Sequence, residues 1–175
     1  MKHSLAKWQF GGFVFVSVLG ILLHFLYDWS GENMLLAPIS AVNESIWEHM
    51  KILFVPMFLY AILEHRFMSS EYPKFWCAKL WGMLCGVLLI PVLYYTIQGA
   101  FGGSPDWVNI AIYFLVAALV FLLETHMLKH DHVCCKQPSV AFVVLCFLMV
   151  LFAILTFVTP RFPLFADPID GTYGV

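Results

Sequence analysis

Five long stretches of mainly apolar residues dominate this sequence and restrict the fold that it can adopt. Each is close to the roughly 20 residues that an α-helix needs to cross about 30 Å of hydrocarbon. They cover residues 9–28, 46–65, 75–98, 107–128 and 138–159. The sequence therefore predicts an all-α fold, a five-span transmembrane helical bundle.

The composition favours a membrane protein over a soluble one. Of the 175 residues, 62% are hydrophobic and 11% are charged, whereas a soluble domain has about 25% charged residues. So few charges cannot cover the chain with polar surface. The formal net charge of −2 provides no basic face for nucleic acid. The length fits a single integral-membrane domain over residues 1–175.

The distribution of Lys and Arg predicts the orientation, because cytoplasmic loops carry an excess of these residues. With the N-terminus in the cytoplasm, two of the nine, Lys51 and Arg161, fall at outer ends. The remaining ones fall at cytoplasmic ends: Lys2, Lys7, Arg66, Lys74, Lys79, Lys129 and Lys136. We expect a multi-pass plasma-membrane protein with its N-terminus inside and its C-terminus outside.

Two connecting segments lie on the predicted outer side. Residues 34–42 are too few to cross and contain Pro38, so we expect a short interfacial segment. Residues 160–175 combine prolines with large apolar side chains such as Phe162 and Phe165. We predict that this C-terminal segment folds back over the outer mouth as a lid; a flexible tail is the alternative.

Polar side chains collect at the predicted outer ends of four spans. His24 and Asp28 are four residues apart, and Glu44, Glu48 and Lys51 share one helical face. Ionisable groups at membrane depth are costly and usually face the bundle interior or a wet cavity. We therefore predict an outward-facing polar pocket. Its candidate ligand-binding residues are His24, Asp28, Glu44, Glu48, His49, Lys51, Asp106, Asn109 and Arg161.

Four of these residues are candidate metal ligands: His24, Asp28, Glu48 and His49. Imidazole nitrogen combined with carboxylate oxygen suits a divalent metal such as zinc, and also iron. Without a metal, the same groups suit a proton relay or a small cation. His49 discriminates between a structural role, a ligand-binding site and a catalytic metal site, because it lies about 100° around the helix from Glu48. The two side chains cannot both face one pocket unless the helix start is distorted.

A purely structural interpretation of the same residues stands beside the functional one. Ser45 and Glu48 match a capping box, in which the two side chains satisfy free amides at a helix start. Lys51 is positioned to pair with Glu48, and Asp28 to orient His24. In that case the polar groups only arrange helices.

The predicted cytoplasmic end holds other features. His126, His130, His132, Cys134 and Cys135 match no standard zinc spacing. We expect a polar loop there, with metal binding and palmitoylation of the cysteine pair as alternatives. The odd total of five cysteines argues against a complete disulfide framework.

Two further motifs concern helix ends and packing. Residues 64–66 (Glu-His-Arg) are expected to end the second span at the cytoplasmic interface. Gly82 and Gly86 form a small-residue face that favours helix packing within the bundle first and a homodimer second.

Three segments carry a resemblance to a known family: HFLYDWSGEN (24–33), VNESIWEHMK (42–51) and PLFADPIDGTYG (163–174). Together they resemble a family of small bacterial integral-membrane proteins classified as a domain of unknown function. The resemblance implies a bacterial inner-membrane location. It implies no substrate and no catalytic residue.

Three functions follow as hypotheses. The first is binding of a metal ion, proton or small polar ligand in the outer pocket, in transport or sensing. The second is metal-assisted hydrolysis in the same pocket, and the third is a structural or scaffold role in the membrane. The middle of each span is almost wholly apolar, which argues against a conducting pore formed by one chain.

Overall fold

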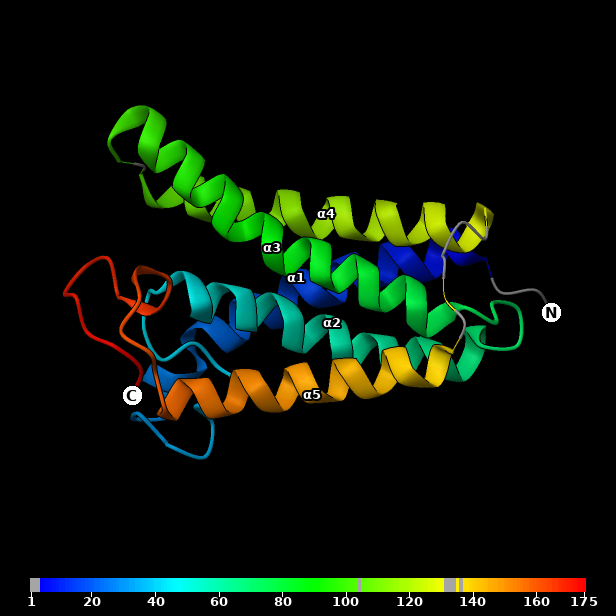
Figure 1. Cartoon of the computed structure of the whole chain (residues 1–175), viewed down its shortest axis with the longest axis horizontal. Coiled ribbons are helices and arrows are strands. Elements are labelled where there is room, and N and C mark those ends of the chain that lie inside the picture. The colour runs from blue at the N-terminus through cyan, green and yellow to red at the C-terminus, as the bar shows by residue number, and fades with distance from the viewer. Residues whose placement is uncertain (1–3, 104, 131–134, 136) are drawn as a thin grey trace.

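The computed structural model describes the whole chain except residues 1–3, 104, 131–134 and 136. Five α-helices run along its length (Figure 1). They are α1 (Leu5–Trp29), α2 (Ile46–Met68), α3 (Phe75–Phe101), α4 (Asp106–His130) and α5 (Pro138–Phe157). All five are long and apolar enough to cross a membrane. The predicted five-helix, all-α class is therefore confirmed, and the predicted span ends differ from the helix ends by four residues at most.

The two ends of the bundle are named here after the chain termini that lie nearest to them. The N-terminal end holds the α2–α3 connection, and the C-terminal end holds the α1–α2 and α3–α4 connections (Figure 1). Local sequence explains several helix limits. The Ser45 hydroxyl accepts the Glu48 N–H at 3.3 Å and caps α2. Gly102, with φ of 71°, ends α3 in the left-handed conformation that glycine tolerates best.

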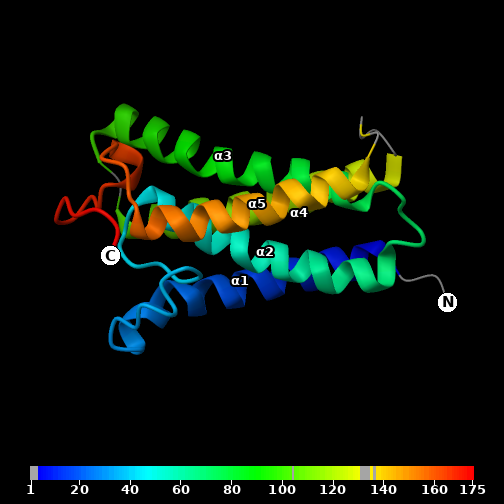
Figure 2. The same cartoon turned by 60° about the horizontal axis from the view of Figure 1, so that its bottom comes forward.

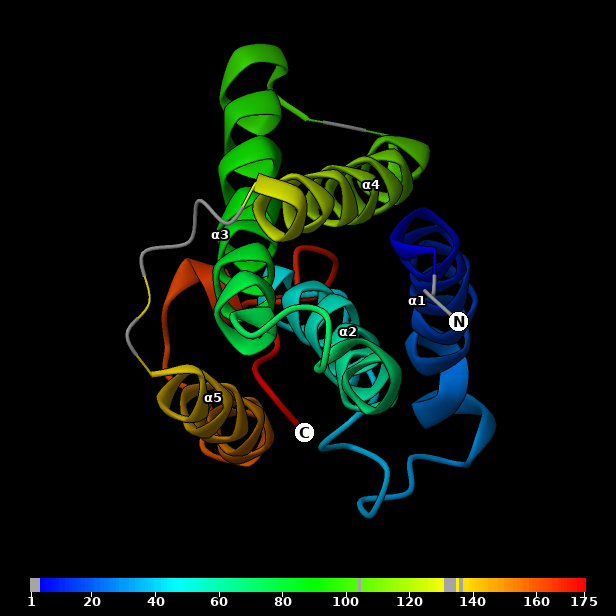
Figure 3. The ribbon, with the colours of Figure 1, turned by 90° about the vertical axis from the view of Figure 1, so that its right-hand side faces the viewer.

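Helix α2 lies at the centre of the bundle, with the other four helices around it (Figure 3). Within its most apolar 18-residue window 78% of residues are buried, compared with 22–39% in the other four helices. The outer faces of those four helices are apolar, as shown by Phe10, Leu122 and Phe147, each more than 60% exposed. A surface of this kind suits lipid rather than water.

Helices α1 and α4 meet through glycines. A side chain at Gly12 would clash with the Phe121 ring, and one at Gly20 would clash with the Tyr113 hydroxyl. Toward the C-terminal end, which is the far end in Figure 3, α1 and α4 lean away from each other. Residues of both helices line a cavity at that end.

Gly82 and Gly86 face α4 within the same chain. A Cβ at Gly82 would lie 2.5 Å from Glu124 Cγ, and one at Gly86 would lie 2.7 Å from Val120 Cγ2. This small-residue face is therefore occupied by the chain's own α4. These two glycines are therefore not available to a second copy of the chain, so the homodimer that we considered through them has no surface there.

The C-terminal segment, residues 158–175, lies across the C-terminal end beside the start of α2 (Figure 2). It contains a short 3₁₀ helix, Pro163–Phe165, and the Phe165 ring packs 4.7 Å from the Trp47 ring. The Asp167 carboxylate accepts the Glu44 N–H at 2.9 Å. Residues 34–42 also remain at this end, where the Ala41 N–H donates to the Leu23 carbonyl at 3.1 Å.

Candidate functional site

Three side chains from two parts of the chain converge at the C-terminal end. Glu44, just before α2, places one carboxylate oxygen 3.5 Å from His24 Nε2 and the other 3.6 Å from His49 Nε2. One donor atom from each residue lies within 4.8 Å of the other two. His24 comes from α1 and His49 from the first turn of α2. We call His24, Glu44 and His49 the His–Glu–His cluster.

The surroundings of His49 orient its ring. Its Nδ1 lies 2.9 Å from the Ser45 carbonyl oxygen. A carbonyl only accepts hydrogen bonds, so Nδ1 carries the proton and Nε2 keeps its lone pair. That lone pair is directed toward Glu44 and His24. A backbone bond to one ring nitrogen is the usual way in which proteins orient a metal-binding histidine.

Hydrogen bonds to the C-terminal segment also fix the backbone at Glu44 and its neighbour Asn43. The Asp167 carboxylate accepts the Glu44 N–H, and the Asn43 side-chain amide donates to the Gly174 carbonyl at 3.3 Å. The side chains of His24 and His49 are about one-fifth exposed, and that of Glu44 is 43% exposed. The cluster is therefore partly buried, yet it remains open to solvent on the side of Glu44.

A cavity of about 510 Å³ adjoins the cluster. His24, Glu44 and His49 contribute to its wall, and most of the remaining wall is apolar. The walls come from α1, α2, α3 and α4, and Pro168 and Ile169 of the C-terminal segment close part of it. Apolar contributors include Ile21, Ile52, Ile90, Ile112 and Phe114. The arrangement combines a polar group of potential ligands with a space for an apolar moiety.

Glu48 and Lys51 do not join this cluster. They form an ion pair of 2.5 Å with side chains that are 2% and 0% exposed. The Lys51 ammonium also donates to the Ala37 carbonyl and to the Thr156 hydroxyl, each at 2.8 Å. The Glu48 carboxylate accepts the Val42 N–H at 3.0 Å. The pair connects α2 to the α1–α2 connector and to α5. Glu48 faces away from the His–Glu–His cluster because it lies about 100° around α2 from His49.

The remaining predicted residues are dispersed. Asp28 and Arg161 are exposed, whereas Asn109 lines the cavity. Asp106 begins α4, and its side chain lies outside the described part of the structure. We predicted Glu44 as a ligand-binding residue but not as a metal ligand. Its carboxylate lies beside the two histidines, where we expected those of Asp28 and Glu48.

A second buried polar group lies at the N-terminal end and was missed from the sequence. Lys79 Nζ lies 2.6 Å from Glu64 Oε2 and 2.6 Å from Glu124 Oε2. The Gln9 amide donates to Glu64 Oε1 at 2.6 Å. Glu64, Glu124 and Lys79 are at most 1% exposed. Glu64 therefore does not simply end α2 at the interface, because its side chain points into the bundle.

Cysteine and histidine side chains at the N-terminal end are arranged differently from our expectation. Cys77, at the start of α3, forms a disulfide with Cys135, just before α5. No motif in the sequence indicated this pairing. His126 and His130 are exposed, with ring centroids 4.7 Å apart. The predicted loop residues His132 and Cys134 lie outside the described residues.

The five apolar helices and their lipid-compatible outer surface define a multi-pass membrane protein. The chain belongs to the family of unknown function DUF6512, which matches residues 1–175. The predicted resemblance to an uncharacterised membrane-protein family is thus confirmed. No curated protein and no solved structure matches the chain.

Proposed function

We propose that this protein binds a divalent metal ion such as zinc through the His–Glu–His cluster, in a pocket on the outer side of the plasma membrane, and acts in metal transport or sensing. The observation that carries the proposal is the convergence of His24, Glu44 and His49. Their donor atoms approach one another, and the His49 tautomer leaves its Nε2 lone pair available.

The spacing suits a tetrahedral ion. Ligand atoms bound to one such ion at about 2.1 Å lie about 3.4 Å from each other. Glu44 lies 3.5 Å from His24 Nε2 and 3.6 Å from His49 Nε2. These two distances involve different Glu44 oxygens, and one donor atom from each residue lies within 4.8 Å of the other two. Binding of one ion would therefore require the three side chains to move closer together. Two imidazoles and one carboxylate form a typical zinc ligand set.

The proposed orientation rests on charge distribution. Lys51 and Lys79 are buried in ion pairs, so neither counts as a loop charge. Among the other Lys and Arg residues, Arg161 alone belongs to the C-terminal end by its place in the chain. The positive-inside rule then puts the C-terminal end, and the cluster with it, outside the cytoplasm. The C-terminal segment acts as the lid of this pocket, since Pro168 and Ile169 form part of the cavity wall.

Metal-assisted hydrolysis is the second candidate function. Three protein ligands leave one position of a tetrahedral ion open, as in catalytic zinc sites. Water in that position becomes a nucleophile near neutral pH. The adjoining cavity of about 510 Å³ has a mainly apolar wall, which suits the hydrocarbon part of an amphiphilic ester or amide.

The first experiment measures zinc binding to the purified full-length protein in detergent, by metal analysis and titration calorimetry. We expect one zinc ion per chain, and at least about a hundredfold weaker binding for His24→Ala, Glu44→Gln or His49→Ala, since each removes a ligand. Asp28→Asn and His126→Ala are controls that should bind as wild type does. The proposal fails if wild type binds no zinc, or if His126→Ala alone removes binding.

A second measurement separates the two candidate functions. The zinc-loaded protein is incubated with a fluorogenic long-chain ester, with and without a chelator. Turnover that disappears with the chelator and in Glu44→Gln supports the hydrolase. Stoichiometric zinc without turnover of the ester or of a matching long-chain amide rejects hydrolysis and favours transport or sensing.

A further inference from the structure

The buried group at the N-terminal end contains an unbalanced set of charges. The group consists of Gln9 from α1, Glu64 from α2, Lys79 from α3 and Glu124 from α4, and we call it the Glu–Lys–Glu cluster. One ammonium faces two carboxylates, each at 2.6 Å. If both acids were ionised, the cluster would hold one net negative charge inside the bundle.

Among the described residues, Lys79 is the one cation in contact with either carboxylate. The other titratable side chains close to the cluster on α2 are Tyr60, whose hydroxyl donates to the Trp8 carbonyl at 2.6 Å, and His65, whose ring packs against the Phe75 and Trp76 rings. Helix α5 carries no Asp, Glu, Lys, Arg, His or Tyr. An uncompensated carboxylate in an apolar interior is strongly unfavourable, and such a group takes up a proton instead.

The hydrogen bonds indicate which carboxylate carries the proton. Glu64 accepts the Gln9 amide and also contacts Lys79. Glu124 contacts Lys79 through Oε2. One oxygen of each acid, Glu64 Oε2 and Glu124 Oε1, is buried without a hydrogen-bond partner among the described residues. An ionised carboxylate is stabilised by the donors that surround it. Two donor groups, the Gln9 amide and the Lys79 ammonium, contact Glu64, whereas Lys79 alone contacts Glu124, so the proton belongs on Glu124.

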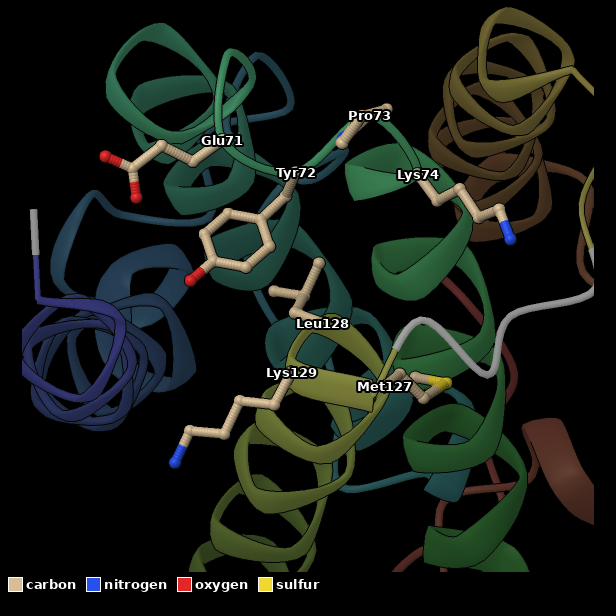
Figure 4. Close-up of a pocket in the computed structure, with 7 residues that line it drawn as sticks. All are labelled: Glu71, Tyr72, Pro73, Lys74, Met127, Leu128 and Lys129. Carbon is tan, nitrogen blue, oxygen red and sulfur yellow. The ribbon is translucent and has the colours of Figure 1, made fainter. Parts of the chain in front are cut away.

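Glu124 lies one helical turn from a residue that lines a cavity. A cavity of about 290 Å³ opens at the N-terminal end between the α2–α3 connection and the end of α4. Figure 4 shows the Tyr72 ring beside Leu128 at this cavity, with the Lys129 side chain further out. Leu128 follows Glu124 by four residues, so the two share a helix face about 6 Å apart along the axis.

We propose that the Glu–Lys–Glu cluster is a proton-binding site, in which Glu124 holds one exchangeable proton at neutral pH and exchanges it with water at the Tyr72–Leu128 cavity. The proton moves between the Glu124 carboxyl group and water, and no other bond changes. The site is independent of the proposed metal site, since the two share no residue.

The test is infrared spectroscopy of the full-length protein in lipid vesicles at neutral pH. A protonated carboxyl group gives a carbonyl stretching band separate from that of carboxylates. We expect such a band in wild type, a shift of it in D₂O and with ¹³C-labelled glutamate, and its loss in Glu124→Gln. Glu32→Gln, at an exposed position near the other end of the bundle, is the control and should retain the band. A wild-type spectrum with no such band, or a band that persists in Glu124→Gln, overturns the proposal.

Thermal stability provides a second readout. Glu124→Gln leaves one acid opposite Lys79, so we expect a melting temperature within about 4 °C of wild type. Lys79→Met leaves two acids without a cation, and Glu64→Gln combined with Glu124→Gln leaves an unpaired ammonium. We expect Lys79→Met and the double variant to melt more than about 4 °C below wild type. A loss in Glu124→Gln as large as in Lys79→Met would show that both acids are ionised and would overturn the proposal.

Discussion

At the scale of single residues, the direction of a side chain decides its role more than its helix or its depth. Glu48 and His49 are neighbours in the first turn of α2, yet His49 faces the His–Glu–His cluster and Glu48 faces Lys51. The sequence indicates both a pocket and an ion pair here. It does not show that Lys51 also bonds Ala37 and Thr156, because these residues are distant in the chain.

The Glu48–Lys51 pair should contribute to stability rather than to metal binding. Lys51→Met leaves a buried carboxylate unpaired, so we expect the free energy of unfolding to fall by about 3–5 kcal/mol. Replacing Glu48 and Lys51 together by Met should recover part of the loss. Arg161→Met, at an exposed position, should change stability by less than about 0.5 kcal/mol. Denaturation of the purified protein in mixed micelles measures all three, and an equal loss in the single and double variants would contradict the pairing.

At the scale of helices, the sequence predicts lengths well and contacts poorly. Hydropathy and length locate each helix because lipid demands about 20 apolar residues from every span. Contacts depend on which faces meet. Gly82 and Gly86 indicate a close approach, but only the structure shows that Glu124 fills the space at Gly82. The same limit explains why Glu64 and Lys79 were expected at helix ends and not in one cluster.

The α1–α4 crossing should be sensitive to a single methyl group. Gly20→Ala places a Cβ against the Tyr113 hydroxyl, which donates to the Val16 carbonyl at 3.0 Å. We expect a loss of about 1–3 kcal/mol in stability. Zinc affinity should also decrease, because Gly20 and Tyr113 line the cavity. Gly99→Ala is the matched control, since a methyl group there meets nothing within 4 Å. Equal melting temperatures for the two variants would argue against a tight crossing.

At the scale of the whole molecule, the disulfide bears on orientation. Cys77 and Cys135 lie at the end that we propose to face the cytoplasm, and disulfides are rare in that reducing compartment. We therefore expect both residues to be thiols in growing cells and to form the bond on purification in air. Alkylation with a large maleimide, in a chain whose other cysteines are replaced, reports the difference as a gel shift. A bond already present in cells would indicate the opposite orientation.

The central position of α2 has a consequence for how the chain enters the membrane. With a mean hydropathy of 1.4, α2 is the least apolar of the five spans, and it carries Glu48, Lys51 and Glu64. These three residues lie within six residues of the ends of α2, so each costs a lone helix less than the roughly 2.5–3.5 kcal/mol of a charge at its centre. Lys79, the cation that pairs with Glu64, belongs to α3 and is synthesised after α2. We therefore expect α2 to gain more than the other spans from entering the bilayer together with its neighbours.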